Sequence, residues 1–176
     1  MLQANELKSQ LINKVKGSDT VSKAHNNFAD ALKNYILQNL EIKGNYTGFM
    51  PNGSPDSKNG SYTWKLVDIT INASSLQAGA SNGIAGWQTA LANALSTGQI
   101  IGADKTGTIT LTSQALTMVA NVNIDMSSKP KNMEDAYNIV ASGIINSIKS
   151  GLTMPVTVPA TSIAGGTGVV TFTELS

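Results

Sequence analysis

Few residues of this chain combine the type and spacing that catalysis requires. His25 is the only histidine, and no nucleophile-elbow pattern accompanies it. Glu134 and Asp135 are adjacent in the first turn of an expected helix, where the helix dipole stabilises carboxylates. The chain has no cysteine, which excludes thiol catalysis and cysteine-based zinc sites. We therefore predict no enzyme activity, no catalytic residue, no metal site, no cofactor and no small-molecule substrate.

Two glycine-rich runs superficially resemble phosphate-binding loops. Residues 102–108 read Gly-Ala-Asp-Lys-Thr-Gly-Thr, but they lack the Gly-Lys-Ser/Thr spacing. A strand pattern follows both this run and residues 165–168, whereas phosphate binding needs a helix N-terminus. We predict a hairpin turn at each run.

The composition argues against binding to polyanions. Twelve basic and eleven acidic residues leave a net charge of +1, which offers no electrostatic basis for specific binding to nucleic acid or to an anionic membrane. Charged residues make up 13% of the chain, about half the typical share. A surface of this kind repels an approaching protein only weakly. It suits burial in an assembly or, alternatively, a low-charge extracellular protein.

The N-terminal region has two stretches with helical periodicity, residues 2–16 and 20–42, separated by Gly17. The first stretch has only a thin apolar stripe, and a free helix of this length is marginal in water. We predict that residues 1–17 form a helical arm that docks on a partner, and that residues 18–176 form one domain. The apolar stripe of the arm consists of Leu7, Leu11, Ile12 and Val15.

Residues 45–61 are dense in Gly, Pro and Asn, which predicts a long exposed loop. β-Branched and aromatic residues over 61–72 then predict a strand. Trp87 heads an apolar helical stripe, so Trp64 is the freer tryptophan. We predict that Trp64 and Phe49 contribute to an interface.

The rest of the chain predicts further helices and strands. Helical spacing recurs over 82–97 and 133–150, and β patterns cover 108–112, 115–126 and 152–176. In 115–126 the alternation directs Val122 toward the core, and Asn121 and Asn123 outward as interface candidates. The predicted fold is α+β, with three or four helices on a mainly antiparallel sheet and the N-terminal helical arm beside them.

Two alanine-rich helical segments, 28–36 and 87–95, each lead through glycine into Thr- and Gly-rich β segments, and the run Thr161 to Gly168 has a similar style. This order of features resembles the small neck, tail and capsid-associated structural proteins of tailed bacteriophages and related contractile particles. The resemblance implies a virion subunit made in the host cytoplasm. It would assemble with copies of itself into a ring or layer, and with other structural proteins of the particle.

A carbohydrate- or surface-binding module is the alternative. It would use the 45–61 loop and exposed aromatic side chains. Gel filtration with light scattering separates the two hypotheses, because the structural subunit forms a multimer and the binding module remains a monomer that binds glycans.

Overall fold

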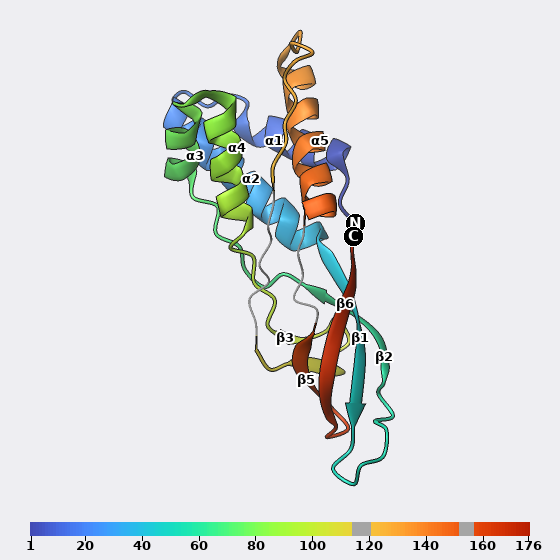
Figure 1. Cartoon of the computed structure of the whole chain (residues 1–176). Coiled ribbons are helices and arrows are strands. Elements are labelled where there is room, and N and C mark those ends of the chain that lie inside the picture. The colour runs from blue at the N-terminus through green and yellow to red at the C-terminus, as the bar shows by residue number, and fades with distance from the viewer. Residues whose placement is uncertain (114–120, 152–156) are drawn as a thin grey trace.

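The computed structural model describes residues 1–113, 121–151 and 157–176. Within these residues, five helices gather at one end of an elongated molecule, and a six-stranded antiparallel sheet occupies the other end (Figure 1). This arrangement confirms the predicted α+β class, the antiparallel sheet and the N-terminal helix. In chain order the elements are α1 (Ala4–Val15), α2 (Val21–Asn39), β1 (Glu41–Phe49), β2 (Gly60–Lys65), α3 (Ala73–Ala80), α4 (Gly83–Leu95), β3 (Gly102–Ala103), β4 (Ile109–Leu111), α5 (Met133–Gly151), β5 (Val158–Ser162) and β6 (Thr167–Leu175).

Residues 45–61 do not form the long loop expected from their composition. β1 passes through the first part of this range, so only 50–59 connects it to β2. Every second residue of β1 is buried, but two of the four buried positions are glycines, Gly44 and Gly48. β1 therefore alternates between buried and exposed residues as strands do. Two of its four buried positions are glycines, so they have no apolar side chain that a sequence pattern could reveal. Because β1 begins at Glu41, α2 ends at Asn39 and is shorter than the predicted helix over 20–42.

The pairing of β1 with β6 is central to the sheet, whose strand order is β2-β1-β6-β5-β4-β3. It extends from Ile42 opposite Leu175 to Phe49 opposite Thr167. Near its far end Gly48 faces Gly168. A Cβ on Gly48 would collide with the Tyr46 hydroxyl, and one on Gly168 with the carbonyl oxygen of Thr47. The two glycines therefore let the strands approach closely.

The sheet curls until its two outer edges meet. The Lys105 N–H, in the β3–β4 turn, donates to the Thr63 carbonyl of β2 at 2.8 Å. An isolated antiparallel bridge joins Asp68 to Gln99, just beyond β2 and just before β3. The rolled sheet encloses Trp64, whose ring meets that of Phe172 edge to face at a centroid distance of 5.7 Å. Curling thus protects the sheet edges and forms an aromatic core.

The β3–β4 turn confirms the predicted hairpin at Asp104. Its buried carboxylate accepts hydrogen bonds from Thr106 N–H, Thr108 N–H and Ile109 N–H, each at 2.7 Å. Burial by itself raises the pKa of Asp104, but the hydrogen bonds from Ile109, Thr106 and Thr108 outweigh it and leave this pKa below its usual value. The Asp-Lys-Thr-Gly run is therefore a carboxylate-stabilised turn.

The expected strand over 115–126 is only partly within the described residues, because 114–120 lie outside them. Over 121–126 the predicted alternation of burial is confirmed, with Val122 and Ile124 buried. The predicted strand is wrong for this stretch, because 121–126 form no strand and pair with no described strand. Its backbone instead bonds to helix side chains, with the Asn123 N–H donating to Ser147 of α5 at 3.1 Å and Gln88 of α4 donating to the Ile124 carbonyl at 2.9 Å. It therefore belongs to the helical end of the molecule.

The helix α1 packs along α2 and α5 of its own chain (Figure 1). The Tyr35 hydroxyl of α2 accepts from the Gln3 N–H and donates to the Gln3 carbonyl at 2.8 Å, which fixes the start of α1. Leu7 and Leu11 are fully buried, as is Leu2 just before the helix. Leu7 and Leu11, predicted to meet a partner, instead complete the core of the chain.

We predict that α1 contributes to folding, contrary to the expectation that a docking arm can be removed without loss of fold. Leu7→Ala should lower the free energy of unfolding by about 2–5 kcal/mol, the usual cost of truncating a buried leucine. Urea unfolding followed by circular dichroism measures this change. Lys14→Ala, on the exposed face of the same helix, is the matched control. Equal stability of the two variants would mean that α1 is separable.

Candidate functional site

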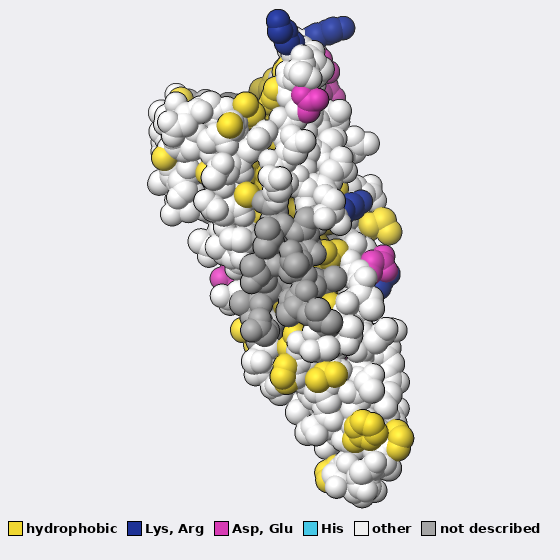
Figure 2. Space-filling view, viewed as in Figure 1, with side chains coloured by type: hydrophobic (Ala, Val, Ile, Leu, Met, Phe, Trp, Pro, Cys, Tyr) yellow, Lys and Arg dark blue, Asp and Glu magenta, His cyan; other side chains and the backbone are white. Residues whose placement is uncertain are grey.

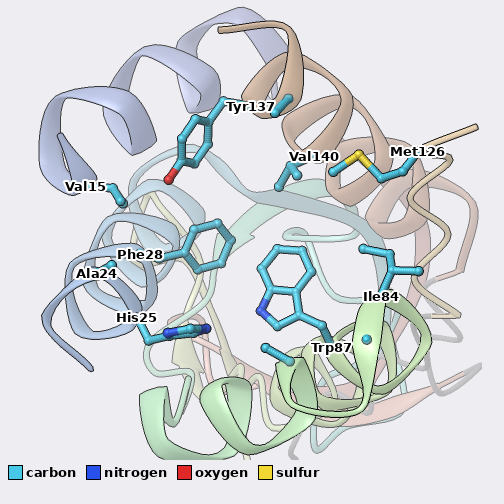
Figure 3. Close-up of a pocket in the computed structure, with 12 residues that line it drawn as sticks. Val15, Ala24, His25, Phe28, Ile84, Trp87, Met126, Tyr137 and Val140 are labelled. Carbon is cyan, nitrogen blue, oxygen red and sulfur yellow. The ribbon is translucent and has the colours of Figure 1, made fainter. Parts of the chain in front are cut away.

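A cavity of about 490 Å³ opens at the helical end and is lined by residues of α1, α2, α3, α4 and α5 (Figure 3). Its volume falls within the range of about 300–1,000 Å³ that is typical of binding sites. We call it the helical groove. Its lining residues are Val15, Ala24, His25, Phe28, Ala80, Gly83, Ile84, Trp87, Met126, Ala136, Tyr137 and Val140.

Aromatic rings from three different helices form the wall of the helical groove. Phe28 of α2 and Trp87 of α4 lie with ring centroids 5.2 Å apart and planes tilted by 58°. The ring of Tyr137 approaches from α5 (Figure 3). Such tilted arrangements are favourable between aromatic side chains and can accept a further ring. Ile84 lies at the groove and is 43% exposed.

The polar side chains of the helical groove are His25 and Tyr137. The Nδ1 of His25 lies 2.9 Å from the Val21 carbonyl oxygen, which can only accept, so Nδ1 is the donor of this hydrogen bond. Burial raises the pKa of Tyr137, so its hydroxyl is protonated at neutral pH. None of the described residues that line the groove is Asp, Glu, Lys or Arg. The lining is therefore suited to binding an uncharged surface.

A second apolar surface lies at the opposite end of the molecule, where β1 and β5 end and β6 begins. We call it the apolar tip and define it by Phe49, Ile163 and Val169. Phe49 is 55% exposed and Ile163 is 68% exposed. Because Thr47 pairs with Val169, Phe49 and Val169 are diagonal neighbours on the outer face of the sheet.

The apolar tip is also free of formal charge. The stretches 47–55 and 161–169, which build it, contain no Asp, Glu, Lys or Arg. Figure 2 shows hydrophobic side chains at the lower end of the molecule, with no acidic or basic side chain on the visible face of that end. Large apolar side chains clustered without nearby charge indicate a surface suited to contact with another molecule.

A buried carboxylate holds the apolar tip in shape. Asp56, in the 50–59 loop, accepts from the Ser162 hydroxyl at 2.5 Å and from the Tyr46 hydroxyl at 3.2 Å. Its other oxygen accepts from the Lys58 N–H at 2.8 Å. The Ser162 hydroxyl in turn accepts from the Gly166 N–H at 3.2 Å. This network, which we call the Asp56 clasp, ties the β1–β2 loop to the β5–β6 turn.

The interface residues predicted from the sequence fall into three groups in the structure. Phe49, Asn121 and Asn123 are exposed, and Ile12 and Val15 are half-buried, with Val15 at the helical groove. Leu7, Leu11 and Trp64 are buried. Trp64, predicted to contribute to an interface, is 1% exposed inside the rolled sheet. The residues next to Trp64 in the sequence do not indicate the curled sheet that encloses its ring.

Sequence reasoning missed the helical groove and the Asp56 clasp. The groove combines residues from five helices, and its lining extends from Val15 to Val140 of the sequence. Asp56 lies in a turn-rich stretch, and its partner Ser162 is distant in sequence. Only the joint absence of charge from 47–55 and 161–169 could have indicated the apolar tip.

Comparisons of this chain with protein-family models, with curated proteins and with solved structures found no match. None of the helices described here has the length and apolar character needed to cross a membrane. Among residues 1–113, 121–151 and 157–176, no group of His, Asp and Glu side chains is arranged to hold a metal ion.

We predict that the Asp56 clasp stabilises the fold at neutral pH and that this stabilisation is lost in acid. The hydrogen bond from Ser162, with those from Lys58 and Tyr46, lowers the pKa of Asp56 below its usual value. A carboxylate with a lowered folded-state pKa stabilises the fold above its unfolded pKa of about 3.9, and this contribution is lost as the pH falls through the folded pKa.

Asp56→Asn should therefore lower the melting temperature at pH 7, and the difference from the wild type should shrink below about pH 4. Thermal unfolding at a series of pH values measures this. Asp30→Asn, at an exposed position of α2, is the control. A difference in melting temperature that stays constant across the pH series would contradict stabilisation by an ionised Asp56.

Proposed function

We propose that the protein is a structural subunit of a phage-like particle. In this proposal it assembles with copies of itself into a ring or layer, in the head–tail neck or the tail, and contacts other structural proteins of the particle. It would be made in the host cytoplasm and reside in the virion. The proposal rests on the sequence resemblance together with one structural observation.

The observation is that an elongated chain has uncharged apolar surfaces at both ends, the apolar tip and the helical groove. Assemblies in which each copy uses two different surfaces are heterologous, and they close into rings when the rotation between copies permits. A protein that forms only symmetric dimers needs one such surface. Two separate surfaces therefore favour a ring or a continuous layer.

The low charge of the chain supports the same proposal. Charged residues are depleted from the cores of protein–protein interfaces because their desolvation is costly. With 13% charged residues, this chain loses little hydration energy when its surfaces are covered. Asn121 and Asn123, exposed near α4 and α5, supply neutral hydrogen-bonding groups for contact with neighbouring proteins.

The alternative of a carbohydrate- or surface-binding module retains Phe49 as an exposed aromatic residue in the 45–61 region. Tyr46 and Trp64 are buried, and the Tyr62 hydroxyl donates to the Lys58 carbonyl at 2.7 Å. Glycan-binding platforms use exposed aromatic faces, so these contacts weaken the alternative without removing Phe49 from it.

We predict that the purified full-length chain forms a discrete oligomer. Size-exclusion chromatography with multi-angle light scattering, over a range of protein concentrations, should give a fixed multiple of the 18.3 kDa chain mass. Negative-stain microscopy of the same fraction should show closed rings. A strict monomer at every concentration, with glycan binding that is lost in Phe49→Ala, would instead support the binding module.

A further inference from the structure

We infer that the apolar tip of one copy docks into the helical groove of a second copy. This inference rests on the proposed function and specifies the contact through which the subunits would join. It commits to a second copy as the occupant because this chain itself provides both halves of a matched pair of surfaces.

The first argument is chemical complementarity. The apolar tip presents Phe49, Ile163 and Val169 without a charged residue in its two stretches, and none of the described residues that line the helical groove is Asp, Glu, Lys or Arg. Docking one into the other therefore buries apolar surface without desolvating a charge. An acidic or basic partner would find no counter-charge inside the groove.

The aromatic geometry suits the same pairing. Phe28 and Trp87 already form a tilted pair along the groove wall, and Phe49 would add a third ring from the neighbouring copy. Aromatic anchors that fill a pocket dominate the energy of many interfaces. The groove volume of about 490 Å³ is large enough for several side chains.

The apolar tip is also ordered before it binds. The Asp56 clasp fixes the 50–59 loop against the β5–β6 turn, and Asn59 adds a hydrogen bond from the Gly48 N–H at 2.7 Å. A surface that is already in its bound shape loses less conformational entropy on association. The clasp thus presents Phe49 in a defined position.

The test uses the full chain with one charge placed on each surface. Phe49→Asp disables the tip, and Ile84→Asp disables the groove. Both positions are exposed, so the fold should tolerate the change, and circular dichroism verifies this. Val67→Asp, at an exposed apolar position outside both surfaces, is the matched control. If Phe49→Asp fails to fold, Ile163→Asp replaces it.

Each disabling variant alone should associate at least about 30-fold more weakly than the wild type, the effect typical of losing a hot-spot side chain. The two variants mixed in equal amounts should form a 1:1 dimer and nothing larger, because one intact tip and one intact groove remain. Light scattering measures the mass of each sample. The control should assemble like the wild type.

The outcomes separate this inference from the proposed function. A monomeric wild type would overturn both. If the wild type is oligomeric but either variant assembles normally, the tip-to-groove contact is wrong while the proposed function stands. The contact is equally wrong if the single variants are monomeric and their mixture stays monomeric.

Discussion

The antiparallel pairing of β1 with β6 is the contact on which the other features of the molecule depend. It joins the strand that follows α2 to the C-terminal strand, and the backbone of Glu41 exchanges two hydrogen bonds with Ser176 at 2.8 and 2.9 Å. Once this pair is in place, β2 and β5 add on either side, and the sheet curls around Trp64 and Phe172. Because the pairing joins residues distant in the chain, forming it carries a loop-closure cost that its contacts must offset.

The same pairing separates the two ends of the molecule. It directs the β1–β2 loop and the β5–β6 turn to one end of the sheet, where the Asp56 clasp joins them, and leaves the helices at the other end (Figure 1). The apolar tip and the helical groove are consequently far apart on one rigid frame. This polarity, more than any individual side chain, is what favours a head-to-tail mode of assembly.

Sequence reasoning was most accurate where a periodic apolar pattern coincided with a single element. The apolar stripes in the sequence located α2, α4 and α5, because buried positions on a helix recur every three to four residues. It failed for β1, where Gly44 and Gly48 occupy buried positions. It also missed α3, whose alanine-, serine- and glycine-rich sequence packs its backbone against Gly86 of α4. The close contact joins Gly79 of α3 to Gly86, and glycine has no side chain that an apolar pattern could detect.

The candidate surfaces were harder to predict than the elements. Phe49 was identified from its position in a glycine- and proline-rich stretch, and it is exposed as expected. Trp64 was chosen because Trp87 heads a helical stripe, yet Trp64 is enclosed by strands that are distant in sequence. Exposure of an aromatic residue depends on tertiary curling, which local composition does not encode. The groove needs the relative placement of five helices, which only the complete fold supplies.

The most direct measurement is photo-crosslinking from the apolar tip. A photoreactive phenylalanine analogue at position 49 would be activated in a mixture of isotopically light and heavy chains, and the cross-linked peptides would be identified by mass spectrometry. We predict light–heavy cross-links from position 49 to α4 or α5, because the tip and the groove lie at opposite ends and cannot meet within one chain. Light–heavy cross-links to a second tip, or none between chains, would contradict the account.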